Sequence, residues 1–293
     1  MVEKRLKERV ALRIGYLGTN YHGFQIQPRT REPTVEGELF RALRQLKILE
    51  DEDRRAAHYS AAGRTDKGVH ALAQVVSFDT SNQNLSPRML NSALPDDIWV
   101  SALAKPHSEF NARKDAVSRE YRYFLFSQGQ VDLEVARMQE AAELLVGWHD
   151  FANFCQQPEA EQRRSTVRQV KRLEVKKRSS FVVVTVEANG FLRKMVRKIV
   201  SALRLVGSGA RDKKWVEDLL ELRVKEKEQI EPAPAFGLVL KSVSYRGLEF
   251  VEDEYAKRRI TARLKEGLAF HTALAAVLGE MKGLLENSKE CLR

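Results

Sequence analysis

Two spacings of apolar residues, one typical of strands and one typical of helices, alternate along this chain. Four short apolar runs in its first third are typical of strands rich in β-branched and aromatic residues: residues 10–16, 58–61, 73–78 and 98–104. Between the first two runs, Val35 and Leu39 stand at helical spacing after Thr34, a favourable N-cap. A shorter helix opens at Ser86, with Pro87 at its first position. The predicted order is β-α-β-β-α-β, a split βαβ unit.

The same order returns between residues 109 and 250. Strand-like runs and amphipathic helices alternate there, with strands at 120–127, 168–177, 181–188 and 237–245 and helices at 133–146 and 192–206. Gly207 follows the second helix, as is typical of a C-terminal cap. Two halves of one topology, residues 1–108 and 109–250, can join their antiparallel sheets across a pseudo-twofold axis. The prediction is an α+β fold of two ferredoxin-like halves with a cleft between them.

The tail, residues 251–293, has a different character. Its leucines recur at helical spacing behind a basic run at 257–259, so we expect a helical extension. It carries no recognisable chemistry. Packing against the core or against a second copy is the expected role.

Composition limits the classes of partner. The chain has 293 residues, of which 43% are hydrophobic and 31% charged, with a formal charge of +10 and a pI of about 9.6. This excess of positive charge favours a polyanionic partner, although charge alone does not separate RNA from DNA or an acidic protein. No run reaches the eighteen or so apolar residues of a membrane span, and the first residues lack an apolar signal core. We therefore expect a cytoplasmic protein without a membrane partner.

Cysteine and histidine are too few and too scattered to predict a metal site or a disulfide framework. Cys155 and Cys291 have no paired spacing, and the six histidines never fall at ligand spacing. No cofactor and no metal are expected.

A polar turn between two strand-like runs holds the most notable candidate for chemistry. Gly63 and Gly68 bracket Arg64, Asp66 and Lys67, and glycine allows a backbone to approach a ligand closely. An aspartate in such a turn usually bonds its own backbone, so residue chemistry alone favours that structural role.

The order of residues in the turn carries more information than its composition. Residues 63–71, followed by Gln74 and Val75, closely resemble the active-site motif of the tRNA pseudouridine synthase A family. The resemblance implies the pseudouridine synthase fold and a homodimer that acts on tRNA without a cofactor. It also implies that Asp66 is the reacting carboxylate.

Two further segments resemble that family. Residues 118–123 are similar to its Arg-x-Tyr-x-Tyr strand and residues 190–200 to its Phe-Leu-x-x-Met-Val-Arg-x-Ile helix. By resemblance Tyr121 lies against the target base, and Arg197 pairs with Asp66 and keeps it charged. Without the family, Tyr121 reads as a core aromatic and Arg197 as a solvated base.

The remaining candidates are substrate contacts. Arg64 is expected to fill the space that a flipped nucleotide vacates, and Leu238 to pack beneath the uracil ring. Ala235 and Phe236 stand where members of the family usually carry Pro-Glu, which puts RNA contacts by that loop in doubt. The loop from residue 17 to 33 reads equally well as a solvated connector or as an RNA contact. The other predicted substrate-binding residues are His22, Gln25, Gln27, Lys67 and Arg193.

The reaction implied is the isomerisation of uridine to pseudouridine, with the nucleotide flipped into the pocket. The expected targets are positions 38–40, on the 3′ side of the anticodon stem-loop. Three rivals remain: a non-catalytic RNA-binding or chaperone protein, the same chemistry at other RNA positions, and a hydrolytic enzyme acting on RNA. The last ranks lowest, because neither a second carboxylate in a comparable turn nor a set of metal ligands is apparent.

Overall fold

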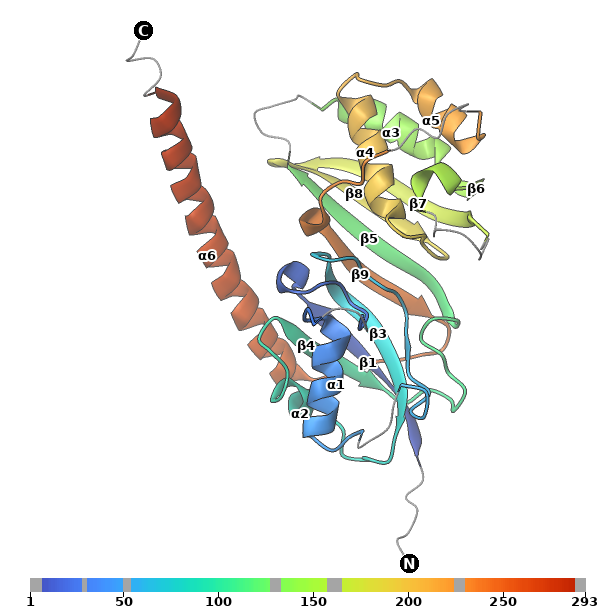
Figure 1. Ribbon diagram of the computed structural model, residues 1–293, viewed down its shortest axis with the longest axis vertical. Coiled ribbons are helices and arrows are strands. Elements are labelled where there is room, and N and C mark those ends of the chain that lie inside the picture. Colours follow the sequence, from blue (N-terminus) through green and yellow to red (C-terminus); the bar gives the residue numbers. More distant parts are fainter. Residues whose placement is uncertain are drawn as a thin grey trace, which may run out of the picture.

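One twisted sheet of ten strands runs through the whole protein in the computed structural model, with helices packed against each half of it (Figure 1). The structure describes residues 7–27, 31–49, 54–126, 133–156, 165–223 and 230–287. The order of strands along the sheet is β10-β4-β1-β3-β9-β5-β8-β7-β6, and β2 pairs with β3 beside this path. The predicted α+β fold is confirmed.

The first half forms the predicted split βαβ unit. Capping side chains open both of its helices, since Thr34 accepts a hydrogen bond from the Gly37 amide and Ser86 one from the Met89 amide. Leu39 is fully buried against the sheet. The elements are β1 (Glu8–Tyr16), α1 (Val35–Gln45), β2 (Ser60–Ala61), β3 (His70–Thr80), α2 (Pro87–Asn91) and β4 (Ile98–Ala104).

The second half repeats this topology with two additions. Its core elements are β5 (Ala116–Phe126), α3 (Val135–Leu144), β7 (Val167–Arg178), β8 (Phe181–Ala188), α4 (Met195–Gly207) and β9 (Leu238–Tyr245). Residue 127, the predicted end of β5, lies outside the described residues. The sequence did not predict β6 (Gly147–Asp150) and α5 (Lys213–Leu220). Helix α4 starts three residues later than predicted, because Lys194 has a φ of 62° and cannot continue a right-handed helix.

The two halves meet where β3 runs parallel to β9. His70 is paired with Val239 and Ala71 with Leu240 at this junction. The turn at residues 62–69 precedes β3, so the pairing brings it next to the second half. Sequence segments far apart are thereby placed on one face of a single sheet.

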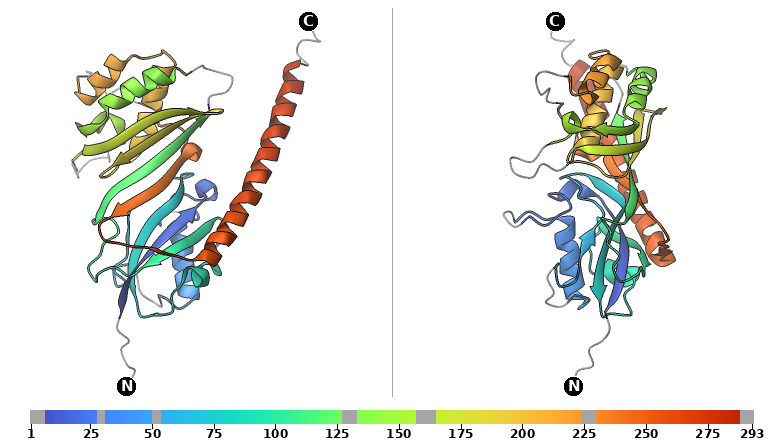
Figure 2. Two further views of the ribbon diagram at one scale, coloured as in Figure 1. Left: turned by 180° about the vertical axis from the view of Figure 1, so that it is seen from behind. Right: turned by 90° about the vertical axis from the view of Figure 1, so that its right-hand side faces the viewer.

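The C-terminal tail forms one helix that leaves the body of the protein. Strand β10 (Val251–Glu252) pairs with β4, and the first turns of α6 (Glu254–Asn287) pack on α2 and β4, with Ala256 buried and Arg263 paired with Asp96. Beyond these turns α6 stands apart from the sheet in Figure 1 and in the left view of Figure 2, and it runs behind the body in the right view. Packing against the core is therefore limited to the beginning of the tail. By length and composition alone, α6 could cross a membrane, although none of its apolar window is buried.

Candidate active site

The turn that carries Asp66 is held from below by the side chain of Gln74. The Gly63 amide donates to Gln74 Oε1 at 3.2 Å, and Gln74 Nε2 donates to the Gly63 carbonyl at 2.9 Å. Gln74 is fully buried, so these two bonds have no competition from water. The backbone of Ala62 also donates to the Val75 carbonyl at 2.8 Å. The turn is consequently fixed on the strand that follows it.

Two further contacts hold the middle and the start of the turn. Tyr16, a buried residue at the end of β1, shares a hydrogen bond of 2.8 Å with the Thr65 hydroxyl. Arg119 from β5 donates to the Ala62 carbonyl at 2.9 Å. Both halves of the protein therefore fix the position of Asp66. Sequence analysis assigned neither residue a role: Arg119 is the arginine of the Arg-x-Tyr-x-Tyr resemblance, whereas nothing in the local pattern distinguishes Tyr16 from an ordinary strand residue.

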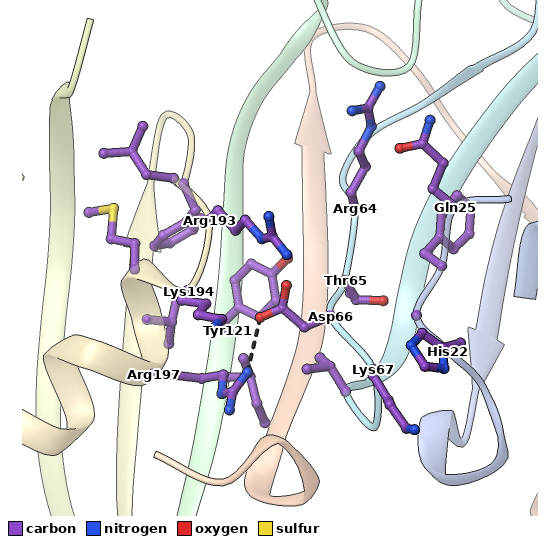
Figure 3. Close-up of a pocket in the computed structure, with 18 of the residues that line it drawn as sticks. His22, Gln25, Arg64, Thr65, Asp66, Lys67, Tyr121, Arg193, Lys194 and Arg197 are labelled. Carbon is purple, nitrogen blue, oxygen red and sulfur yellow. Dashed lines mark hydrogen bonds and ion pairs between the residues drawn. The ribbon is translucent and has the colours of Figure 1, made fainter. Parts of the chain in front are cut away.

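Asp66 and Arg197 form an ion pair across the junction between the two halves. Arg197 Nη1 lies 3.1 Å from Asp66 Oδ2 (Figure 3). The arginine is fixed from behind, since its Nε donates to the Ala233 carbonyl at 2.6 Å. The Arg197 side chain is 14% exposed and that of Asp66 27%. The pair thus leaves the carboxylate open to a ligand while most of the guanidinium is covered.

Tyr121 and Leu238 line the floor beside this ion pair. The Tyr121 ring is buried and meets Phe191 edge to face, with 5.1 Å between ring centroids. Burial raises the pKa of the Tyr121 hydroxyl to about 12; the positive charge of Arg119 lowers it and the negative charge of Asp66 raises it. Tyr121 is therefore a neutral aromatic platform at any working pH. Leu238 adds a buried apolar side chain.

A cavity of about 810 Å³ opens around these residues. Its volume falls in the range of small-molecule sites, about 300–1,000 Å³, and so suits a flipped nucleotide. The structure brings all ten predicted site residues to its wall: Asp66, Tyr121, Arg197, Arg64, Leu238, His22, Gln25, Gln27, Lys67 and Arg193. It adds others that the sequence analysis did not single out as site residues, among them Phe24, Val69, Arg113, Phe191 and Lys194.

The predicted substrate contacts differ in how they face the cavity. Arg64 points along the cleft away from Asp66, beside Gln25, whereas Arg193 reaches toward Tyr121 and Asp66 (Figure 3). Gln27 donates to the His22 carbonyl at 3.0 Å and so ties its own loop together. His22 Nδ1 is buried and has no hydrogen-bond partner within the described part of the chain. The loop that contains His22 and Gln27 is thus supported by its own side chains, and both residues line the cavity.

His70 links three segments beside the site. Its Nδ1 accepts a hydrogen bond from the Gly18 amide at 3.1 Å, and its Nε2 donates to the Phe236 carbonyl at 3.1 Å. His70 is thus a hydrogen-bonded scaffold residue. These bonds require the neutral ring with its proton on Nε2.

We expect His70 to make the fold sensitive to mild acid. Burial lowers the pKa of His70 below its ordinary value, so the unfolded chain takes up a proton near pH 6.5 while the folded chain resists it. The free energy of unfolding should therefore decrease as the pH falls below about 6.5. His70→Asn should be less stable at pH 7.5 but should lose less stability between pH 7.5 and 5.5. Urea unfolding of both proteins at the two pH values measures this; an equal loss in the variant would contradict it.

Few side chains at the site are of the types that bind metal ions. Within residues 7–287, apart from the stretches left undescribed, no group of three or more His, Cys, Asp or Glu side chains could hold a metal ion. The groups around the cavity are instead one carboxylate, several bases and several aromatic rings.

Known proteins share this sequence over nearly its full length. The family model described as tRNA pseudouridine synthase matches residues 14–113 and 141–246, more than half of the chain. A "tRNA pseudouridine synthase A" of Methanococcoides burtonii is 45% identical over 93% of this chain and 96% of its own. The protein of the same name from Archaeoglobus fulgidus is 40% identical over 89% of this chain and 92% of its own.

A solved structure is similar to a lesser degree. A chain of "Crystal Structure of a Cbf5-Nop10-Gar1 Complex" matches 67% of this chain with 17% identity and a TM-score of 0.33, which carries no weight for the fold. The family model and the sequence identities are sufficient by themselves. The predicted resemblance is confirmed, and this chain belongs to the tRNA pseudouridine synthase family.

Proposed function

We propose that this enzyme converts uridine to pseudouridine at positions 38–40 of the anticodon stem-loop of tRNA. Membership of the family supports the reaction and tRNA as the substrate. The observation that carries the chemistry is the Asp66–Arg197 ion pair at the wall of a cavity large enough for a nucleotide. The choice of positions rests on the resemblance of the motif around Asp66.

The site accounts for each step of the isomerisation. The target nucleotide leaves its stack at a cost of a few kcal/mol and enters the cavity, where Tyr121 and Leu238 contact its base. Asp66 acts at the ribose, as a nucleophile at C1′ or as the base for the 2′ proton. The C1′–N1 bond breaks, the uracil rotates, and C5 bonds to C1′. The C5 proton is then lost and N1 gains one, so no atoms are added or removed overall.

The role of Arg197 follows from charge. Arg197 places its guanidinium 3.1 Å from the Asp66 carboxylate, where its positive charge attracts the negative charge of that group. Both routes for Asp66 require the anion. Because the Arg197 Nε bond to Ala233 fixes the guanidinium, the carboxylate is also held in one direction.

We further propose a homodimer and a cytoplasmic location, as expected for an enzyme of this kind acting on tRNA. The formal charge of +10 supports binding of a polyanion. Affinity for tRNA should consequently fall steeply with salt.

Mapping the product on defined transcripts tests the proposed positions. The protein is incubated with an unmodified tRNA transcript and with three matched transcripts in which uridine 38, 39 or 40 alone is replaced by cytidine. We expect pseudouridine at 38–40 in the first and loss of the corresponding site in each of the others. Product at another position would keep the reaction and reject the positions. Binding without product would favour the RNA-chaperone alternative.

An isotope experiment distinguishes the two routes for Asp66. A transcript with deuterium at C2′ of the target uridine should react several-fold more slowly in single-turnover measurements if the carboxylate removes that proton. Equal rates would favour attack at C1′.

Phe236 is expected to stack on an RNA base at the edge of the site. Phe236 is 72% exposed. Its backbone carbonyl nevertheless accepts a hydrogen bond from His70, and the carbonyl of nearby Pro234 accepts one of 3.0 Å from Tyr123. A rigid, exposed aromatic ring is a stacking platform for an unpaired base, worth about 1–3 kcal/mol. Phe236→Ala should raise KM for tRNA about tenfold with little change in kcat, whereas Phe236→Tyr should retain both. Initial rates over a range of tRNA concentrations measure this, and an unchanged KM in Phe236→Ala would contradict it.

A further inference from the structure

The distal part of α6 carries large apolar side chains that are exposed in the described part of the chain. Leu274 is 41% exposed, Leu278 57%, Met281 55% and Leu285 69%. Soluble monomers rarely expose so many large apolar side chains in one place. The contacts of α6 with α2 and β4 come from its first turns, and these side chains lie beyond them (Figure 2).

The spacing of the apolar residues indicates what covers them. From Leu264 onward, alternating steps of three and four, the pattern of a seam between two helices, lead through five large apolar side chains and through Gly267 and His271. The seam consists of Leu264, Gly267, His271, Leu274, Leu278, Met281 and Leu285. A partner helix would fit this stripe.

Neither a bilayer nor RNA fits it as well. The stretch free of charged residues runs from Gly267 to Gly279, between Glu266 and Glu280, and is about 20 Å long at 1.5 Å per residue. A bilayer core is about 30 Å thick, so a helix that crossed it here would have to bury Glu266 or Glu280 as well. From residue 267 to 285, Lys282 is the one Lys or Arg, and it is paired with Glu286. Phosphate binding requires more bases than this.

A seam between two α6 helices would by itself bury less area than a stable interface needs. Half the surface of α6 from residue 264 to 285 is on the order of 500 Å², below the roughly 800 Å² per partner of a stable interface. The same chain supplies a second apolar surface on the side that α6 flanks, at the end of β5 and the start of β8 (Figure 1). There Phe124, Phe126 and Phe181 form an exposed aromatic cluster, with ring centroids 5.5 Å and 6.4 Å apart.

We infer that α6 is a dimerisation arm: its seam packs on α6 of a second copy, and its outer side covers the aromatic cluster of that copy. A twofold axis would bury both surfaces of each copy at once, as closed symmetric dimers do. The inference rests on the proposed homodimer, and it does not depend on the proposed reaction.

Sedimentation velocity of the full-length protein at tens of micromolar tests the arm. We expect a dimer for the wild type and for the control K265E/E266K, which exchanges two exposed charges at the start of the exposed part of α6. The double variant Leu274→Glu/Leu278→Glu should weaken dimerisation at least a hundredfold and sediment as a monomer. The variant Phe126→Ser/Phe181→Ser should weaken it about tenfold. Circular dichroism verifies that all variants keep their helix content.

Three results would overturn the inference. They are a monomeric wild type, a double variant that stays dimeric, and wild-type protein that floats with anionic phospholipid vesicles, which would assign α6 to a lipid surface. The isomerisation assay is read separately. A dimeric wild type that makes no pseudouridine would reject the proposed reaction and leave the arm supported.

Discussion

Replacing Asp66 with Asn should abolish isomerisation while leaving the protein folded and able to bind tRNA. The side chains have nearly the same shape, so the turn and its bonds to Gln74 and Tyr16 remain. An amide, however, can neither attack C1′ nor remove a proton. Removing the central group of a catalytic site costs on the order of 10⁴-fold or more in kcat.

Single-turnover assays with excess enzyme measure this loss, and filter binding measures the affinity for tRNA. We expect the affinity of Asp66→Asn to remain within about threefold of wild type, since the variant removes one negative charge from a basic cleft. Asp150→Asn serves as the matched control. Asp150 accepts a hydrogen bond from the Ala152 amide in a turn that does not line the cavity, so its loss should leave kcat unchanged. Residual product from Asp66→Asn at even a hundredth of the wild-type rate would assign the chemistry to another group.

Arg197→Met should reduce kcat by about 10²–10³-fold. Methionine fills most of the same volume on α4 but removes both the charge beside Asp66 and the bond to Ala233. Loss of one preorganised electrostatic contact typically has an effect of this size. The effect should fall on kcat more than on KM, because Arg197 acts through the carboxylate.

Arg193→Met is the comparison, since it removes the same charge from the same cavity wall. Arg193 is exposed in the loop just before α4 and is expected to contact RNA phosphate. This variant should therefore raise KM and leave kcat unchanged. Arg197→Lys should recover part of the activity, because an ammonium restores the charge without the guanidinium's second bond. If Arg193→Met and Arg197→Met show the same split between kcat and KM, the ion pair has no special role.

The periodicity of apolar residues was enough to predict the fold, because every core strand and helix has its own local signal. Val35 and Leu39 behind Thr34, or Ser86 with Pro87, define a helix without reference to distant residues. Strand β6 has only four residues and α5 only eight, so their local signals are weak. The start of α4 could not be placed either, because the left-handed backbone of Lys194 depends on how the preceding loop packs.

The residues of the candidate site also fall into two groups, those that the sequence predicts and those that only the structure reveals. Asp66, Tyr121 and Arg197 were found because their surrounding sequence resembles a known family, and the structure then brought them together. Two residues that position them, Tyr16 and Arg119, act through contacts between distant segments. No spacing along the chain reveals that Tyr16 bonds Thr65. Such support is visible only in three dimensions.

The parallel pairing of β3 with β9 joins two parts of the chain that are synthesised at different times. Asp66 is synthesised more than a hundred residues ahead of Arg197, and domains tend to fold in order of synthesis, N-terminal first. A nascent chain that has emerged only as far as β5 therefore carries the carboxylate without its counter-charge. The ion pair can form only after α4, which carries Arg197, has been synthesised and has come to lie beside the first half.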